Sequence, residues 1–433
     1  MLQKWLERSF QLSKNDTSVK KELTAGTVGY FAIVYIIAVN SLILSEAGIP
    51  LEGAIIATIL SSVVGCLLMG FWANVPILLV PGMGINALFS YTLVQSLGLS
   101  WQEALGVVFV SGVIFTFIAF SRYAKKLSAA IPKSLKEAIT VGLGLFLMLI
   151  GLEKGGIVER GTNSIIALGD LSHPQVLATI FTFIVAIVLF MRNVRGNFLI
   201  SMLSGTVIAL LFGTIDMTGF SIQSFTLADY TSVFAAFSFK SIFKLSFWVA
   251  VFSLTMVIVF ENIGTVHGHV QFIKRPDKFA KAFQANSVSA MLSGLFGTSP
   301  TVSTVETAAS LAAGGRTGLT SVTTAMLFLL SAFFIPVIKL IPDSAIAPIL
   351  MIIGGLMLQN IRHLDLKDLS ESFPAFFIIA MIPFTYSIAD GIAVGFILYP
   401  LLKVAIGKAR EVSFTLYIIA CLFLANFIVM MNS

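Results

Sequence analysis

The chain has 433 residues, of which 57% are hydrophobic and only 11% are charged, and its mean hydropathy is +0.97. Because a soluble domain carries about 25% charged residues, this composition excludes an ordinary soluble protein. The net charge of +6 does not indicate a nucleic-acid partner, since the Lys and Arg residues lie between apolar stretches and form no stripe interleaved with aromatic residues. The sequence predicts an integral membrane protein.

Apolar stretches of about 20 residues recur along the chain, and each is long enough to cross the hydrocarbon core as a helix. Barrel strands would alternate polar and apolar residues, so we expect an all-α membrane fold. The first seven predicted spans are 23–44, 52–71, 78–95, 101–121, 135–153, 174–191 and 196–214. After a more polar stretch at 216–244, seven more follow at 245–262, 281–297, 302–313, 318–340, 345–360, 372–387 and 389–405. The sequence leaves open whether a last apolar segment, 413–431, crosses the bilayer.

The basic residues predict the orientation of these spans, because cytoplasmic loops carry an excess of Lys and Arg. With the N-terminus in the cytoplasm, the basic clusters within 122–136, 192–195, 274–281 and 403–410 all fall on the cytoplasmic side. The first apolar stretch has no small-residue cleavage site at its end, so no signal-peptide processing is expected. We therefore expect a multi-pass protein of the cell membrane with a cytoplasmic N-terminus.

Seven is an odd number, so the second set of spans would cross the membrane upside down relative to the first, as in the inverted repeats of secondary transporters. Polar residues support this repeat. Asn40 late in span 1 corresponds to Glu261 late in span 8, and Asn86 in span 3 corresponds to Glu306 in span 10, at nearly the same offset.

Spans 3 and 10 are interrupted at corresponding places. Residues 80–89 read Val-Pro-Gly-Met-Gly-Ile-Asn-Ala-Leu-Phe, and residues 297–307 read Gly-Thr-Ser-Pro-Thr-Val-Ser-Thr-Val-Glu-Thr. Broken backbone at membrane depth persists only against protein or around a cavity, and paired breaks in two repeats point to a transport site. The alternative is that Gly and Pro only permit close helix packing.

Two glutamates lie within predicted spans, where a charged group costs about 2.5 to 3.5 kcal/mol on insertion scales. Glu261 and Glu306 are therefore candidates to bind a substrate, and burial favours their neutral form, so either is a candidate proton carrier. The alternative is that each ends its span at the headgroups. Asn40 and Asn86 are candidates either for the site or for hydrogen bonds between helices.

Other motifs carry less information. His267 and His269, which we expect in a solvated basic loop, lack further ligands for a metal, and Cys66 and Cys421 form neither a disulfide framework nor a zinc site. Residues 132–139 resemble an amphipathic entry into span 5 that belongs to a moving part. The sequence contains no phosphate-binding loop for ATP. We expect no metal and no cofactor, with a proton as the coupling ion.

Several motifs together resemble the AzgA-like branch of the nucleobase permeases, within the xanthine/uracil permease superfamily, and in particular bacterial guanine and hypoxanthine permeases. They are residues 19–26 (Val-Lys-Lys-Glu-Leu-Thr-Ala-Gly), 38–40, 45–48, 81–87, 131–136, 297–299 and 305–309. The resemblance implies that Glu261, Glu306 and Asn86 hold the base. One departure is that 260–265 read Phe-Glu-Asn-Ile-Gly-Thr, where close purine relatives have Phe-Asp-Thr-Ala-Gly-Thr, so the longer acid changes the depth of the pocket.

The resemblance also implies a division into a core domain and a gate domain, and a homodimer formed through the gate. We expect a cytoplasmic N-terminal segment (1–22), core spans 1 to 4 (23–121) and 8 to 11 (245–340), and gate spans 5 to 7 (122–214) and 12 to 14 (341–405). An extracellular connection (215–244) and a C-terminal apolar segment (406–433) complete the chain.

The expected function is import of purine nucleobases, guanine or hypoxanthine and possibly adenine, by proton symport through alternating access. The backbone near Gly84 and Val305 is expected to contact the base, and Phe89 and Phe260 are candidates to stack on it. The full set of expected substrate-binding residues is Glu261, Glu306, Asn86, Gly84, Ile85, Val305, Thr265, Phe89 and Phe260. Alternatives are an anion transporter of sulfate or bicarbonate type, a uracil or xanthine permease, and a membrane enzyme or receptor that does not transport.

Overall fold

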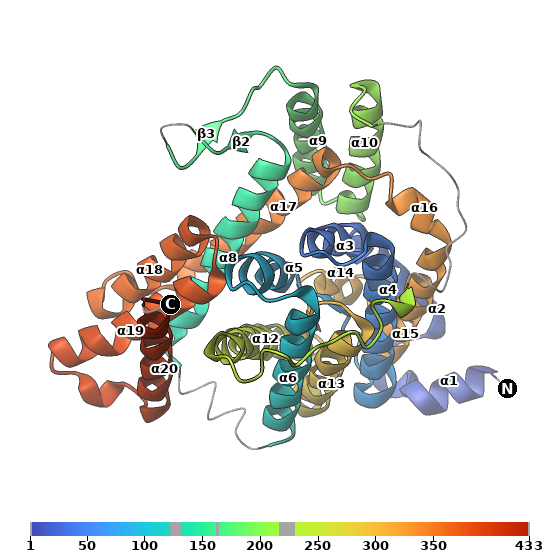
Figure 1. Ribbon diagram of the computed structural model, residues 1–433. Helices are drawn as coiled ribbons and strands as arrows, with labels where there is room; N and C mark the ends of the chain where they lie inside the picture. The colour runs from blue at the N-terminus through green and yellow to red at the C-terminus, as the bar shows by residue number, and fades with distance from the viewer. Residues whose placement is uncertain (1, 122–130, 162–163, 216–229, 432–433) are drawn as a thin grey trace.

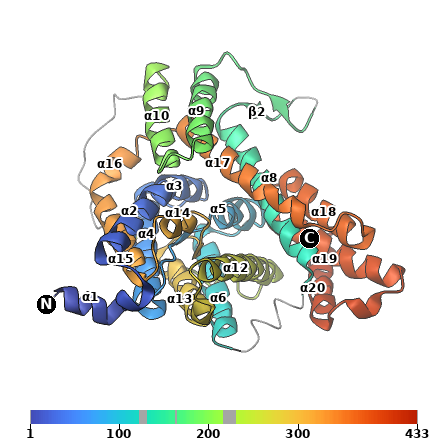
Figure 2. The ribbon, with the colours of Figure 1, turned by 180° about the vertical axis from the view of Figure 1, so that it is seen from behind.

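The structure is a computed structural model that describes residues 2–121, 131–161, 164–215 and 230–431. It consists mainly of helices, which Figures 1 and 2 show from opposite sides. The first residues of the predicted gate domain (122–130) and part of the predicted outer connection (216–229) lie outside the described residues. An amphipathic helix, α1 (Leu2–Phe10), precedes the first span and lies at the periphery beside the N-terminus.

The first half of the chain follows the predicted order of spans. Its elements are α2 (Val19–Ile33) with α3 (Ile36–Glu46), α4 (Leu51–Leu68) with the π-helical η2 (Met69–Ala73), β1 (Leu79–Pro81) with α5 (Met83–Ala87) and the π-helical η3 (Leu88–Ser96), α6 (Trp101–Phe120), α8 (Lys133–Lys154), α9 (Pro174–Met191) and α10 (Asn197–Leu211). A two-residue ladder of β2 (Val158–Glu159) and β3 (Ala167–Leu168) lies between α8 and α9.

The second half repeats this order. Its elements are α12 (Leu245–Phe272), α13 (Phe279–Phe296), β4 (Thr301–Ser303) with α14 (Thr307–Ala312), α15 (Gly318–Leu330) with η5 (Ser331–Phe334) and α16 (Ile335–Ile338), α17 (Asp343–Leu358) with η6 (Gln359–His363), α18 (Leu369–Thr385), α19 (Ile388–Ala405) and α20 (Phe414–Met431). Short 3-10 turns lie at 13–15, 276–278 and 409–411.

Nine helical segments of the described chain meet both the length and the hydropathy expected of a membrane span. The other five spans fail one of these two criteria for different reasons. Spans 3 and 10 are broken, α10 and α18 are shorter than 18 residues, and α13 is more polar because it carries Lys281, Gln284, Asn286 and three Ser residues.

The helices assort into two packed groups. In one, α8 lies along α17 and α18, and α9 and α10 join it through α17; in the other, α6 packs on α13, α15 on α2 and α4, and α3 on α4. The α8–α17 contact is close because glycines face each other. A Cβ atom on Gly354 would lie 2.4 Å from the Gly144 carbonyl oxygen, so this crossing tolerates no side chain at either position.

The α20 helix packs on α12, which contacts α6 and α13 of the second group, and on α19, which contacts α18 of the first group. Its Phe423 ring packs edge-on against Phe252 of α12 and Phe396 of α19, with centroid distances of 5.4 Å and 6.1 Å. The C-terminal apolar segment, whose placement the sequence left open, is therefore a helix beside spans 8 and 14.

The expectation that His267 and His269 lie in a loop is wrong, and of the two only His267 is exposed to solvent. The α12 helix continues past Gly264 and Gly268 to Phe272, so both histidines are helical. The His269 side chain is buried and its Nδ1 lies 3.0 Å from Ser303 Oγ of β4. Its role is to hold the broken segment of span 10.

A buried carboxylate joins the first span to span 11. Glu22 is fully buried and accepts hydrogen bonds from the backbone N–H groups of Arg316 (2.9 Å) and Thr317 (3.2 Å), just before α15. The Thr17 and Thr320 hydroxyls donate to the same carboxylate, at 2.8 Å and 2.6 Å. Glu22 thus satisfies two backbone N–H groups of the turn that leads into α15, through charge-assisted hydrogen bonds.

We expect Glu22→Ala to destabilise the protein by about 3 kcal/mol or more, because four donors lose their acceptor in a buried place. The measurement is the midpoint of thermal unfolding of the purified protein in detergent. The control is Glu52→Ala, since the Glu52–Lys339 ion pair is exposed and such pairs contribute about 0 to 1 kcal/mol. Equal midpoints for the two variants would contradict the role of Glu22.

Candidate functional site

The two broken segments meet in the middle of the fold. Strands β1 and β4 pair antiparallel, with Val80 opposite Val302 and Pro81 opposite Thr301. Because the helix is interrupted at these residues, their backbone N–H and C=O groups have no partners within a helix, and the two-stranded ladder supplies such partners. Each strand leads into a short helix, α5 after β1 and α14 after β4, so the two repeats contribute matching halves of one centre.

Buried amide and hydroxyl side chains hold the broken backbone. Asn262 Oδ1 accepts a hydrogen bond from the Ser303 N–H at 2.9 Å and another from the Asn286 amide. Asn40 Nδ2 donates to Thr58 Oγ1 (2.7 Å) and Thr298 Oγ1 (3.0 Å). Asn40 therefore joins spans 1, 2 and 10 by hydrogen bonds. Of the two roles that the sequence left open for Asn40, this is the one that links helices.

A cavity of about 530 Å³ lies beside this centre, within the range of about 300 to 1,000 Å³ typical of small-molecule sites. Its walls come from the breaks in spans 3 and 10, from α12, and from α8 and α17 across the gap. Six of the nine predicted site residues line it: Glu261, Glu306, Gly84, Val305, Thr265 and Phe260.

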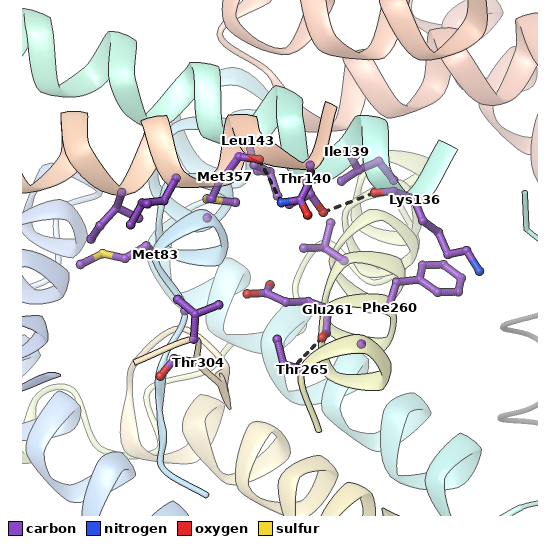
Figure 3. A pocket seen from close by; sticks show the side chains of 18 of the residues that line it. Met83, Lys136, Ile139, Thr140, Leu143, Phe260, Glu261, Thr265, Thr304 and Met357 are labelled. Carbon is purple, nitrogen blue, oxygen red and sulfur yellow. Dashed lines mark hydrogen bonds between the residues drawn. The ribbon is translucent and has the colours of Figure 1, made fainter. Parts of the chain in front are cut away.

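The two predicted acids face this cavity together. Glu261 points from α12 toward its centre, with Met83 and Thr304 on one side and Ile139 and Thr140 on the other (Figure 3). Within the described residues, neither Glu261 nor Glu306 forms an ion pair with Lys, Arg or His. Carboxyl groups without a basic partner in such a place require hydrogen-bond donors or a proton.

The other predicted lining residues have more limited roles. Thr265 Oγ1 donates to the Glu261 backbone carbonyl at 2.8 Å, a hydrogen bond within the helix. Lys136 Nζ lies 5.4 Å from the centroid of the Phe260 ring, which therefore sits beside a cation at the wall of the cavity. Such a ring face is already occupied in part, so stacking on Phe260 competes with Lys136.

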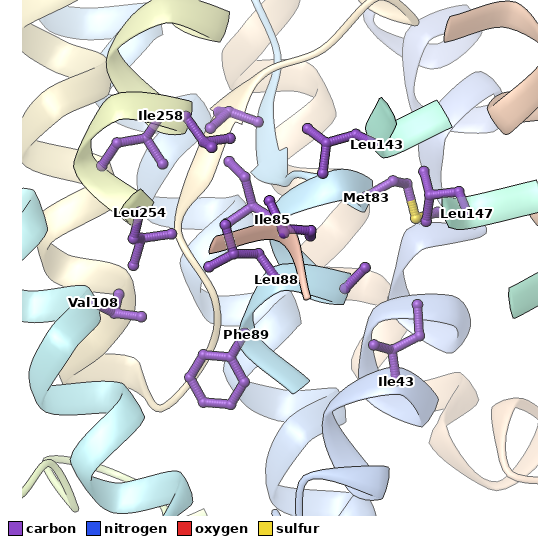
Figure 4. Close-up of a cluster of buried hydrophobic side chains, with 14 of the residues drawn as sticks. Ile43, Met83, Ile85, Leu88, Phe89, Val108, Leu143, Leu147, Leu254 and Ile258 are labelled. Atoms are coloured by element: carbon purple, nitrogen blue, oxygen red, sulfur yellow. The ribbon is translucent and has the colours of Figure 1, made fainter. Parts of the chain in front are cut away.

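Asn86, Ile85 and Phe89 are not among the cavity-lining residues. Ile85 and Phe89 are fully buried and point into an apolar cluster with Leu88, Leu254 and Ile258 (Figure 4). Successive residues of a helix rotate by about 100°, so Met83 and Gly84 face the cavity while the next positions of α5 turn away. Asn86 Oδ1 accepts from Ser299 Oγ at 2.6 Å, which fixes α5 to span 10.

Thr304 and Tyr35 also line the cavity, and the sequence analysis predicted neither of them. Thr304 lines the cavity, and its Oγ1 is buried without a hydrogen-bond partner in the described part of the chain. The only feature of the sequence that could have indicated Thr304 is its place in the run of Ser and Thr residues before Glu306. Tyr35 donates its hydroxyl hydrogen to Glu306 Oε1 at 2.6 Å, and nothing in its apolar surroundings in span 1 marked it.

Ion pairs link the two helix groups at one end of the spans. There Lys154 at the end of α8 forms ion pairs with Glu46 of α3 and with Asp343 of α17, the latter at 3.2 Å. Tyr91 donates to the same Glu46 at 2.8 Å. On the opposite side, which carries the N-terminus, the lining includes residues at the other ends of α8 and α17: Lys133, Lys136, Glu137, Asn360 and His363. The cavity is thus bounded by polar helix ends on that side.

Comparison with known proteins identifies a family and several relatives. The model of the permease family designated Xan_ur_permease matches residues 20–394. The chain is 49% identical over 383 residues to the nucleobase transporter PlAzg2 of Paenibacillus larvae, covering 88% of this chain and 77% of that protein. It is 36% identical over 424 residues to the guanine/hypoxanthine permease PbuO of Bacillus subtilis, covering 96% and 98%. These relatives are transporters rather than enzymes.

The transmembrane domain of the cyanobacterial bicarbonate transporter BicA has a similar structure, with a TM-score of 0.66 at 15% identity, covering 86% of this chain and 96% of that one. At this identity the likeness concerns the fold alone. It confirms the predicted all-α fold of fourteen membrane spans in two inverted repeats of seven.

Cysteine labelling tests the cavity. In a background with Cys66 and Cys421 replaced by Ala, we expect Val305→Cys, whose native side chain is 64% exposed, to react at least about tenfold faster with a small water-soluble thiol reagent than Phe89→Cys, because thiol reactivity requires access. The native Phe89 side chain is 0% exposed. Mass spectrometry of the intact protein follows the reaction, and equal rates would contradict the described faces of the two broken segments.

Proposed function

This chain belongs to the Xan_ur_permease family of permeases, and from that premise we propose that it imports purine nucleobases, guanine and hypoxanthine foremost, together with a proton. The observation that carries the proposal is the meeting of two acids, Glu261 and Glu306, in one cavity between the broken spans with no basic partner in the described residues. Purine bases present ring and exocyclic N–H groups, which carboxylates accept. The names of the relatives PlAzg2 and PbuO support the same substrate class.

In the proposed site, Glu261 accepts hydrogen bonds from an N–H edge of the base. Its carboxyl group has no hydrogen-bond partner in the described residues, so both oxygens are open to a ligand. Guanine carries adjacent ring and amino N–H donors, which match the two oxygens of a carboxylate. The unpartnered Thr304 hydroxyl is the group we assign to a carbonyl or ring nitrogen of the base, and the apolar side chains of Met83, Leu143 and Met357 cover its faces.

The proton enters on one of the two acids. We propose that one acid takes up a proton when the base binds, because two carboxyl groups face one cavity and neither has a basic partner in the described residues. The net charge of the two acids then becomes less negative when the base occupies the site. We propose no metal and no cofactor in this cycle.

Alternating access requires two parts that move relative to each other. We propose that the group built from spans 1 to 4 and 8 to 11 is the core that carries the acids, and that spans 5 to 7 and 12 to 14 form the gate. With the N-terminus in the cytoplasm of a cell-membrane protein, the Lys154–Glu46–Asp343 cluster closes the extracellular side. The state described is then inward-facing. We further propose a homodimer formed through the gate.

An anion transporter is the second candidate, since BicA shares the fold. Two acids that face the cavity without basic partners would repel an anion, whereas Lys133 and Lys136 lie only at the wall near the cytoplasmic helix ends. Charge therefore favours a base over sulfate or bicarbonate.

Substitution of the acids tests the assignment. We expect Glu306→Gln and Glu261→Gln each to reduce uptake of radiolabelled hypoxanthine and guanine by at least about tenfold, because an amide presents an N–H group where the base needs an acceptor. Uptake by cells lacking their own purine permeases is the measurement. The control is Glu52→Gln, a carboxylate at the outer surface. Uptake like that of the wild type in both cavity variants would refute the proposal.

Competition and coupling identify the substrate and the ion. Unlabelled guanine and hypoxanthine are expected to compete best for labelled hypoxanthine, ahead of adenine, xanthine and uracil, with sulfate and bicarbonate inactive. In proteoliposomes, addition of hypoxanthine is expected to acidify the lumen, as read by a trapped pH-sensitive dye. If uracil or xanthine competes best, the assignment of guanine and hypoxanthine as substrates is wrong. Competition by the anions would favour the second candidate, and transport without acidification would exclude proton symport.

A further inference from the structure

Span 1 is also interrupted next to the site, in addition to the breaks in spans 3 and 10. The α2 helix ends at Ile33 and α3 begins at Ile36, so Val34 and Tyr35 form a turn between them without Gly or Pro. The Tyr35 side chain is 1% exposed. Its ring packs edge-on against Phe198 of α10 at a centroid distance of 5.1 Å, which fixes the direction of the hydroxyl.

That hydroxyl makes Glu306 different from Glu261. The Tyr35 O–H donates to Glu306 Oε1 at 2.6 Å, and this is its sole hydrogen bond within the described residues. The hydroxyl hydrogen therefore has one acceptor available. A hydrogen bond from a buried donor to a carboxylate is among the strong kinds. One oxygen of Glu306 is thus occupied by the protein, whereas the Glu261 carboxyl group has no such donor.

We propose that Tyr35 is a positioning residue that holds Glu306 by Oε1 and so leaves Oε2 as the oxygen that serves the substrate. While the Tyr35 hydrogen points at Oε1, a proton taken up by Glu306 resides on Oε2. Ionised Glu306 then offers an acceptor to an N–H group of the base, and protonated Glu306 offers a donor at the same place to a ring nitrogen or carbonyl. This inference deepens the proposed function and rests on it.

Tyr35→Phe removes the hydroxyl and keeps the ring against Phe198. The matched control is Tyr30→Phe, because Tyr30 lies one turn earlier in the same span and its hydroxyl bonds Ser331 Oγ at 2.8 Å, away from the cavity lining. We expect Tyr35→Phe to weaken equilibrium binding of radiolabelled hypoxanthine to the purified full chain by about tenfold. Tyr30→Phe is expected to bind within about twofold of the wild type.

A double-mutant cycle separates positioning from a general structural effect. If Tyr35 acts through Glu306, then Tyr35→Phe weakens binding much less in a Glu306→Gln background than in the wild type. In a Glu261→Gln background its full effect remains. Equal weakening in all three backgrounds, or no difference between Tyr35→Phe and Tyr30→Phe, would overturn the inference.

Infrared spectroscopy gives a second measurement that needs no ligand. The carboxyl bands lost on Glu306→Gln substitution identify Glu306, and we expect these bands to shift in Tyr35→Phe but not in Tyr30→Phe. Unshifted bands would overturn the inference even where binding is too weak to measure. Conversely, shifted bands in a protein that binds no nucleobase would uphold the contact between the two side chains and refute the proposed function alone.

Discussion

The whole site depends on one constraint: peptide N–H and C=O groups at membrane depth need partners, and a break in a helix removes them. Here two breaks supply each other's partners through the β1–β4 ladder. Neither segment can form this ladder alone, so the two repeats must meet face to face. The place where they meet is then the place where backbone, hydroxyl groups and acids lie together in an otherwise apolar protein.

The polar side chains around the ladder divide into two sets with different roles. Asn40, Asn86, Asn262 and His269 bond to β4 or to the segment before it, behind the cavity. The acids, with Thr304, line the cavity itself. Each residue of the first set makes at least one of these hydrogen bonds, whereas Thr304 Oγ1 and the Glu261 carboxyl group have no partner within the described residues. The first set makes the broken segments rigid, and rigidity is what lets the second set present a defined pattern of acceptors.

The family resemblance, the span order and the meeting of Glu261 with Glu306 were predictable from the sequence, and the comparisons confirm the first two. The acids were predictable because a carboxyl group within an apolar span is costly and rare. The side of α5 that faces the cavity was not predictable from the sequence. Gly84 and Asn86 are two residues apart, and composition does not say which of them turns toward the cavity. Tyr35 was missed because its turn lacks Gly and Pro, and His269 because α12 continues through two glycines.

The position of α20 has a mechanical consequence. Phe423 rests on α12, which carries Glu261, and on α19 of the other group. In the proposed cycle, in which one group slides past the other, the Phe423 ring cannot stay packed on both Phe252 and Phe396 without moving itself. In that cycle the α20 helix therefore opposes relative movement of the two groups through three aromatic rings, none of which lines the cavity.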